Sequence, residues 1–405
     1  MDEAIPTLSD AVAPPVVRGT ADLTTFAYAG NAYEALLDRI APPAGGSASL
    51  YDRSIASQLS FRRAEGLSLQ DAALEMSQVY RVGNPQEGSL RLLALVGPGD
   101  LMTNTPLDFL TNHLNIRLDL LYILPDRPLP AVIPEHDVAF FAIGEADPPE
   151  LDRLRRLFAL WPRPALNNPG FLPALERDVL SGSLADVSGV CSPQTVAVDR
   201  AALDAHVAYG APIGGYDASR GLYPCLIRPL ASHAGTGLAR INDAAELAKY
   251  LHLSFERRFF VTAFEDYASA DDLYRKSRIA FIDRTPFLCH MAISSHWMVH
   301  YLNAGMTESG EKRAEEASAM ASFDQGFARR HTAAFEALHE RLGLDYYSID
   351  CAETHDGRLL VFEADAAAIV HAMDPPDLFP YKQSHMRRVF VAFEDMLRRH
   401  AAQSR

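Results

Sequence analysis

Between residues 89 and 164, short apolar runs alternate with amphipathic stretches. The runs predict three buried strands, at 92–97, 118–124 and 138–144. Apolar residues spaced three to four apart predict two helices, at 106–114 and 149–160. This order of elements is typical of a small, mainly parallel sheet flanked by helices, so we expect an α/β domain here.

The first 88 residues have a helical pattern instead. Helix-forming residues with suitable apolar spacing run from Ala21 to Ile40 and from Ser57 to Tyr80, and a link rich in Pro, Gly and Ser at 41–47 divides them. We expect a helical region separate from the rest of the chain, acting as a cap or an interaction region and carrying no chemistry of its own.

Beyond residue 164 the predicted strands suit antiparallel pairing. Single strands are expected at 194–198, 225–229 and 258–263, with a helix at 243–251. Hairpins are expected at 277–293, turning about Arg284-Thr285, and at 346–363, turning at Asp356-Gly357. A long charged helix at 308–342 lies between the hairpins, and a basic helix at 384–399 follows them. The expected domains are therefore 1–88 (helical), 89–164 (α/β) and 165–405 (α+β).

Composition narrows the classes of function. Of the 405 residues, 48% are hydrophobic and 22% are charged, as in ordinary globular proteins. Acidic residues outnumber basic ones by 52 to 37, which gives a net charge of −15. Such a surface disfavours nucleic-acid partners, and any phosphate site has to be a local basic pocket.

Targeting signals and membrane spans are not expected. The amino terminus is acidic and lacks the layout of a signal peptide, and no apolar run approaches the roughly 20 residues that span a bilayer. Four cysteines without CxxC spacing, at 191, 225, 289 and 351, argue against a disulfide framework. We therefore expect a cytoplasmic protein with no membrane partner.

Three segments carry residues suited to chemistry, and the first is a glycine-containing loop after the strand at 225–229. That strand delivers Arg228 just before the loop, where glycines let backbone N–H groups approach a phosphate. The candidate phosphate-binding residues are Arg228, Ser232, His233, Gly235, Thr236 and Gly237. The alternative is a plain turn with a surface arginine, since the loop matches neither GxxxxGK[ST] nor GxGxxG.

The second segment joins two predicted strands. The strand at 258–263 runs into Glu265, Asp266 and Tyr267, whose polar groups suit a ribose hydroxyl or an adenine amine. The next strand carries Lys276 and Arg278, which have the same parity and therefore lie on one face. Two cations on one face either bind an anion or lie in solvent, where they protect an exposed edge strand against aggregation.

The third segment is the final hairpin. Asp350 lies on one strand, and Val361, Glu363 and Asp365 alternate in phase on the other, so we expect both acidic side chains of that strand to face one side. Three converging carboxylates need a cation, and hard oxygen ligands completed by phosphate suit Mg²⁺. The alternative is a set of exposed hairpin acids that never converge.

Taken in this order, the three segments resemble the ATP-grasp superfamily, closest to its RimK-like and glutathione-synthetase-like ligases. The matching features are Arg228-Pro229 with its glycine-rich flap, Glu265-Asp266-Tyr267 after a strand, the basic strand at 275–278, and Asp350 followed by Glu363-Ala364-Asp365. Two positions depart from the family pattern, because Arg228 stands where a lysine is expected and Asp365 where an asparagine is expected.

The resemblance implies an ATP-grasp fold, in which two α+β subdomains bind ATP between them. A small parallel-sheet domain precedes these subdomains in the chain. It places adenine against residues 265–267, the phosphates at Arg228, the flap and Arg177, and Mg²⁺ at Asp350, Glu363 and Asp365. Lys276 and Arg278 then neutralise the transferring phosphoryl group. The implied reaction joins a carboxylate to an amine through an acyl phosphate. Expected partners are small carboxylates and amines, such as amino acids or peptides, and a second copy of the chain.

A histidine-rich segment follows the basic strand. His290 is the candidate general base toward the amine, and His296, His300 and Asn303 are candidates for substrate binding. The alternatives are a packed core segment and a zinc site, since His296 and His300 are four residues apart. Other functions that stay open are a small-molecule kinase on the same fold, a nucleotide-binding regulatory module without catalysis and, most distantly, a zinc hydrolase.

Overall fold

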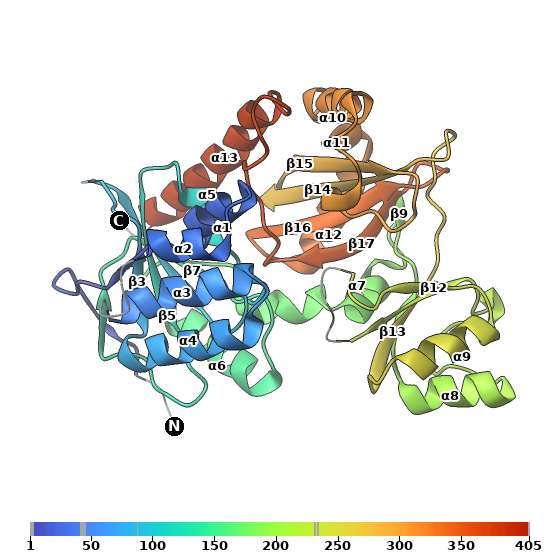
Figure 1. Cartoon of the computed structure of the whole chain (residues 1–405), viewed down its shortest axis with the longest axis horizontal. Coiled ribbons are helices and arrows are strands. Elements are labelled where there is room, and N and C mark those ends of the chain that lie inside the picture. The colour runs from blue at the N-terminus through green and yellow to red at the C-terminus, as the bar shows by residue number, and fades with distance from the viewer. Residues whose placement is uncertain (1–3, 41–45, 87, 231, 233–234, 404–405) are drawn as a thin grey trace.

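The computed structural model describes residues 4–40, 46–86, 88–230, 232 and 235–403. Its first unit is built on a six-stranded sheet in the order β2-β3-β5-β4-β7-β8 (Figure 1). The strands are β2 (Val16–Val17), β3 (Val79–Val82), β4 (Leu90–Val96), β5 (Ile116–Tyr122), β7 (Val138–Phe141) and β8 (Ala165–Leu166). Among these strands only β3 and β5 pair antiparallel. The central strand β4 is buried on both faces, since Leu92 packs into one hydrophobic core and Leu93 into another on the opposite face. Its buried residues are therefore all apolar.

Helices cover both faces of this sheet. On one face α6 (Pro148–Leu160) buries Leu151, Leu154 and Leu157, and the Asp147 side chain caps its first turn by accepting a hydrogen bond from the Glu150 amide at 2.9 Å. The other face is covered by α1 (Thr20–Tyr28), α2 (Tyr33–Arg39), α3 (Ser47–Leu59) and α4 (Arg63–Met76), with α5 (Leu107–Thr111) beside them. A short parallel pair, β1 (Thr7–Ser9) with β6 (Val132–Pro134), lies at the margin.

The amino-terminal helices are not separate from the sheet, contrary to the expectation from the sequence. Their segment supplies β2 and β3 to the sheet, and Leu23 and Tyr80 belong to the same core as Leu92. The helix expected at 57–80 is in fact α3 and α4 joined by a turn at Phe61, and its last residues form β3. The predicted link at 41–47 lies largely outside the described residues. The domain boundaries at 88 and 164 stay a prediction.

The second unit is a four-stranded antiparallel sheet in the order β10-β13-β11-β12, with two helices packed on one face. Its elements are β10 (Thr195–Asp199), α8 (Arg200–Tyr209), η3 (Ala218–Arg220), β11 (Cys225–Pro229), β12 (Ala239–Ile241), α9 (Ala244–Leu253) and β13 (Arg258–Ala263). The strands expected at 225–229 and 258–263 coincide with β11 and β13.

The third unit is a five-stranded sheet in the order β15-β14-β16-β17-β9. Its strands are β9 (Val190–Cys191), β14 (Tyr274–Ile282), β15 (Thr285–Ser294), β16 (Tyr346–Glu353) and β17 (Leu359–Asp365), so both expected hairpins are confirmed. One face packs against α7 (Arg177–Leu184), α10 (Gly310–Ser322) and α12 (Thr332–Leu342), with α11 (Phe327–Arg330) between the last two. The short 3₁₀ helices η2 (Pro169–Leu175) and η4 (Tyr301–Asn303) lie in the connections.

The long helix expected at 308–342 is therefore wrong, because the chain breaks into α10, α11 and α12. Gly326 has a non-helical backbone (φ −103°, ψ −96°), and its amide bonds back to the Ser322 carbonyl at 2.8 Å. The break lets Met320 and Leu338 reach the same core from two directions.

The chain returns to the first unit through α13 (Lys382–Ala402). Phe393 of this helix lies 5.9 Å, centroid to centroid, from Phe140 of β7, and both belong to the core of the first unit. The observed architecture confirms the expected fold class: a mainly parallel α/β unit and two mainly antiparallel α+β units, with helices at the amino end. None of the described helices is both long and apolar enough to cross a membrane.

Candidate active site

Three adjacent strands bring the predicted catalytic and metal residues together. Backbone register pairs Arg278 of β14 with Asp350 of β16, and Asp350 with Glu363 of β17. Asp350 is 4% exposed, and its two oxygens accept from Arg278 Nε at 2.8 Å and from Lys276 Nζ at 2.7 Å. Burial alone would raise the pKa of Asp350, but Arg278 and Lys276 hold it well below its usual range. The predicted shared face of the two cations is confirmed.

A β-bulge in β17 determines the face of the sheet on which its acidic side chains lie. Asp350 pairs with Glu363 but the next residue, Cys351, pairs with Val361, so Phe362 is an extra residue without a partner. Val361 consequently packs into the core under the helices, whereas Glu363 turns to the opposite face beside Asp350. The expectation that Val361 is in phase with Glu363 was wrong, because simple alternation does not survive a bulge. Asp350 and Glu363 therefore lie side by side, whereas convergence of all three carboxylates on a cation stays a prediction.

Arg177 and Arg228 extend this charged face toward the four-stranded sheet. Arg177, at the start of α7, donates a hydrogen bond to Glu363 Oε2. Burial opposes ionisation of Glu363, but Arg177 keeps its pKa below the ordinary value. Burial lowers the pKa of Arg228 to about 10, and Arg177 adds to the lowering. Arg177 therefore has Glu363 as its counter-charge, whereas Arg228 is a buried cation beside a second arginine.

The loop after β11 folds back onto Arg228. The Arg228 guanidinium donates to Ser232 Oγ at 3.2 Å and to the Ser232 carbonyl. Gly235 and Gly237 have positive φ (76° and 68°), and a Cβ on Gly237 would lie 2.8 Å from the Pro229 ring. Thr236 is exposed, and His233 lies outside the described residues. The glycines are therefore required by the backbone, and phosphate binding by the loop stays a prediction.

Asp365 differs from the other two carboxylates, because no cationic side chain of the described residues pairs with it. Its Oδ1 accepts from the Ala367 amide at 2.6 Å, and burial together with Glu363 raises its pKa to about 6. No group of three or more His, Cys, Asp or Glu side chains in the described part of the chain is arranged to hold a metal ion. Glu363 and Asp365 nevertheless have the hard oxygen donors that suit Mg²⁺, whereas Asp350 is already paired on both oxygens.

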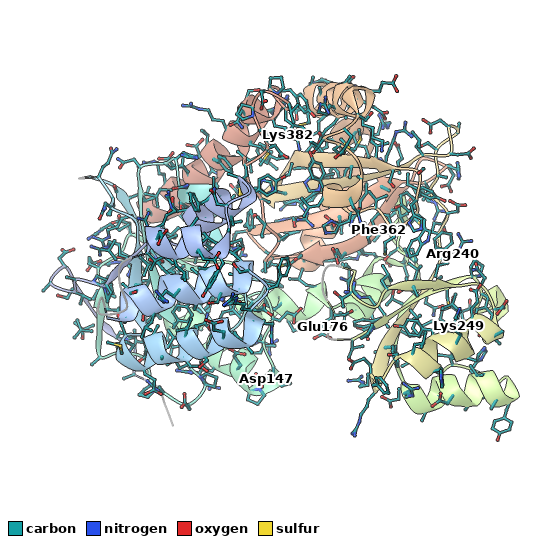
Figure 2. All side chains as sticks on the ribbon, viewed as in Figure 1. Asp147, Glu176, Arg240, Lys249, Phe362 and Lys382 are labelled. Atoms are coloured by element: carbon teal, nitrogen blue, oxygen red, sulfur yellow. The ribbon has the colours of Figure 1, made fainter. Side chains whose placement is uncertain are left out.

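An aromatic cluster joins the two antiparallel sheets near residues 265–267. The Arg240 guanidinium of β12 lies 4.0 Å from the centroid of Phe264, whose ring is 5.9 Å from Trp297. Tyr267 is buried, and its ring centroid lies 5.0 Å from that of Phe362. Its hydroxyl donates a hydrogen bond to the Trp297 carbonyl at 2.6 Å, so this side chain packs within the protein. Figure 2 shows Phe362 and Arg240 on the sides of the two sheets that face each other.

The acidic neighbours of Tyr267 have fewer contacts. Asp266 accepts from the Ala268 amide at 3.1 Å and Glu265 is half-buried, so adenine binding at 265–267 stays a prediction. The sequence reading missed Arg240 and Phe264 altogether, since no pattern shows which side chains of two separate sheets will meet.

The histidines divide into two groups. His290 of β15 is the register partner of Arg278, and its ring lies 4.5 Å from Tyr301, centroid to centroid. Burial, with Arg278 nearby, holds the pKa of His290 well below its ordinary value, so the imidazole is neutral. His296, His300 and Asn303 are exposed beyond the strand, although burial and Lys276 lower the pKa of His300. The geometry brings His290 to the charged face and leaves the roles of the other three as predictions.

Comparison with known proteins finds similarity to solved structures alone. No family model and no curated protein matches the chain. It is similar to the RimK domain protein ATP-grasp from Sphaerobacter thermophilus, with 18% identity, a TM-score of 0.42, and 77% of this chain and 99% of that one covered. It is also similar to D-alanine–D-alanine ligase from Bacillus anthracis complexed with ATP (12%, TM-score 0.42, 78% and 98%) and to D-alanyl-alanine synthetase A from Vibrio cholerae (11%, 0.47, 78% and 100%).

Proposed function

We propose that this protein is an ATP- and Mg²⁺-dependent ligase that joins a carboxylate to an amine. The observation that carries the proposal is the charged face of β14, β16 and β17. Four cations (Arg177, Arg228, Lys276, Arg278) and three carboxylates (Asp350, Glu363, Asp365) meet there, so one positive charge is in excess before any substrate binds. Fixed charges of this kind suit a triphosphate and the transfer of its terminal phosphoryl group.

Each group has a role in this proposal. Arg228 and Arg177 bind the phosphates, and the Arg240–Phe264 pair with Phe362 forms the wall for the base. Glu363 and Asp365 hold Mg²⁺, which when bound neutralises phosphate charge. Asp350 keeps Lys276 and Arg278 in place, so that their charge faces the phosphoryl group as the substrate carboxylate attacks it.

The amine then attacks the carbonyl carbon of the acyl phosphate. The new C–N bond forms, the C–O bond to phosphate breaks, and phosphate leaves with the bonding electrons. His290, which is neutral beside Arg278, accepts the proton that the amine loses. The expected substrates are small acids and amines.

Calorimetric titration of a non-hydrolysable ATP analogue, with and without Mg²⁺, tests the nucleotide site. The proposal expects Mg²⁺-dependent binding, and absence of binding in both conditions contradicts it. An ADP-release assay over the twenty amino acids as acids, with hydroxylamine as the trapping amine, tests the chemistry. Hydroxamate indicates an acyl phosphate. ADP release without hydroxamate indicates a kinase, and binding without turnover indicates a regulatory module.

A further inference from the structure

Lys382, the first residue of α13 (Figure 2), belongs to a buried ionic cluster. Lys382 is 1% exposed, and its Nζ lies 3.2 Å from Glu316 Oε1 and 3.1 Å from Asp374 Oδ2. Glu316 is fully buried and Asp374 is 4% exposed. Two carboxylates against one ammonium leave this cluster with an excess negative charge, which is costly to bury unless a cation matches it.

The two carboxylates are not equally satisfied. Glu316 accepts from Lys382, from the Met291 amide at 2.9 Å and from the hydroxyls of Tyr381 and Tyr301, at 2.6 Å and 3.4 Å. Asp374 accepts only from Lys382 among the described residues, through Oδ2. The unmatched charge therefore belongs to Asp374, whose Oδ1 lacks a donor.

The surroundings of Asp374 reach the proposed site. His371 lies three residues before Asp374, with the rings of Tyr28 and Phe109 at 6.4 Å and 6.5 Å from its own. The Met373 amide donates to His371 Nδ1 at 3.1 Å, and burial lowers the pKa of His371 to about 4, although Asp374 opposes the shift. Arg278 Nη1 donates to the Ile369 carbonyl at 3.4 Å, two residues before His371, so this loop begins at the charged face.

The cluster already binds one ammonium group. Lys382 Nζ lies between carboxylates and two aromatic faces, 4.1 Å from the centroid of Tyr301 and 4.9 Å from that of Phe379. Carboxylate and aromatic rings together are the surroundings that favour an organic ammonium ion. Asp374 provides a carboxylate, and Tyr28 and Phe109 provide aromatic rings near His371, which are the same kinds of group.

We propose that Asp374, His371 and Tyr28 form the acceptor subsite, and that it takes a primary amine, which enters as an ammonium ion. This inference rests on the proposed ligase function. The ammonium donates to Asp374 Oδ1 and lies against the Tyr28 ring, and it loses one proton to solvent before the neutral amine attacks. Because Tyr28 is the last residue of α1, the amino-terminal helices acquire a part in acceptor recognition.

A pair of small probes tests the charge that the subsite recognises. Glycine ethyl ester carries an ammonium and no carboxylate, and ethyl glycolate replaces the ammonium with a hydroxyl. Titration of the full chain, followed by NMR of the histidine rings, is expected to show saturable binding of the amine at millimolar concentration and none of the glycolate. Equal binding of both probes, or no binding of the amine, overturns the proposal.

Variants locate the binding. Asp374→Asn is expected to weaken amine binding at least tenfold, whereas Asp377→Asn, at an exposed position of the same loop, leaves it unchanged. If Asp374→Asn does not fold, Tyr28→Ala is the test, because Tyr28 is 43% exposed at a helix end. Its loss is expected to weaken binding of the amine at least threefold. Undiminished binding in the variant that folds overturns the assignment. Binding of the ATP analogue is measured in parallel. If the protein binds the analogue but not the amine probe, only this subsite is rejected. If it binds the amine probe but not the analogue, only the ligase function is rejected.

Discussion

Asp350 holds Lys276 and Arg278 with its two oxygens, so the positive charge of the site is fixed before any substrate arrives. Charge that needs no rearrangement during reaction is the largest contribution many enzymes make to phosphoryl and acyl transfer. At the scale of single residues, the site therefore separates into acids that hold cations and acids that are left for a metal ion.

Glu363 is expected to belong to both groups, and Glu363→Gln tests it. The amide still accepts from Arg177 but loses the negative charge that a metal ion needs. ATP turnover is expected to fall at least a hundredfold, about 2.7 kcal/mol, with unchanged circular dichroism. Glu353→Gln, at the far end of the same hairpin, serves as the control. Near-normal turnover would remove Glu363 from the proposed metal site.

Arg228 is expected to bind phosphate directly. Arg228→Ala should weaken the ATP analogue at least tenfold, about 1.4 kcal/mol, because its guanidinium is a buried cation with a lowered pKa. Arg257→Ala, at an exposed position before β13, is the matched control. Equal affinities of the two variants would mean that Arg228 only closes the loop through Ser232.

The sequence predicts how two side chains lie relative to each other when both belong to the same strand. The shared face of Lys276 and Arg278 follows from their spacing in β14. Asp374 could not be found in this way, because it lies in an irregular loop and its partner is Lys382 of α13. No local pattern encodes which loop residue a distant lysine will meet.

At the scale of elements, the hairpins were predictable and the bulge was not. Alternation and the Asp-Gly turn define β16 and β17, but the extra residue at Phe362 depends on what packs on each face. The helix expected at 308–342 failed for a related reason: composition favours helix throughout, and only Gly326 and the packing of Leu338 fix the break.

Two helix ends provide a matched pair of substitutions. Gly343 and Gly210 end α12 and α8 with φ of 63° and 66°, where any Cβ costs about 1 kcal/mol. A Cβ on Gly343 would also lie 2.7 Å from the Phe171 ring, whereas Gly210 has open space. Gly343→Ala is therefore expected to destabilise the protein by at least about 1 kcal/mol more than Gly210→Ala in urea unfolding. Equal losses would show that Phe171 moves aside freely.

The contact between α11 and β16 is expected to depend on pH. His331, 3.3 Å away, and Arg330 lower the pKa of Glu353 from 4.5 to about 2. A lowered pKa means that the carboxylate stabilises the fold above pH 4.5, and that this stability is lost as the pH falls toward 2. Glu353→Gln should therefore cost about 1 kcal/mol at pH 7, after allowance for solvent screening, and nothing near pH 2. A difference that persists at low pH would contradict this explanation.

At the scale of the whole molecule, the amino-terminal helices and the parallel sheet depend on each other. A chain lacking residues 1–88 loses β2, β3 and the helices over one face, which leaves the edge of β5 and the apolar side of β4 exposed. Such a chain is expected to be insoluble, whereas the intact chain is not. Soluble, folded protein from the shortened chain would restore the sequence-based view of a separate helical region.

The return of α13 to the first unit also sets an order of events during protein synthesis. Phe393 packs on Phe140, and Met386, Val389 and Leu397 fill the same core, yet these side chains leave the ribosome long after β7 has emerged. The amino-terminal unit consequently waits with one face uncovered until translation has passed the second and third units. A premature stop before residue 382 would therefore harm the opposite end of the protein from the one it removes.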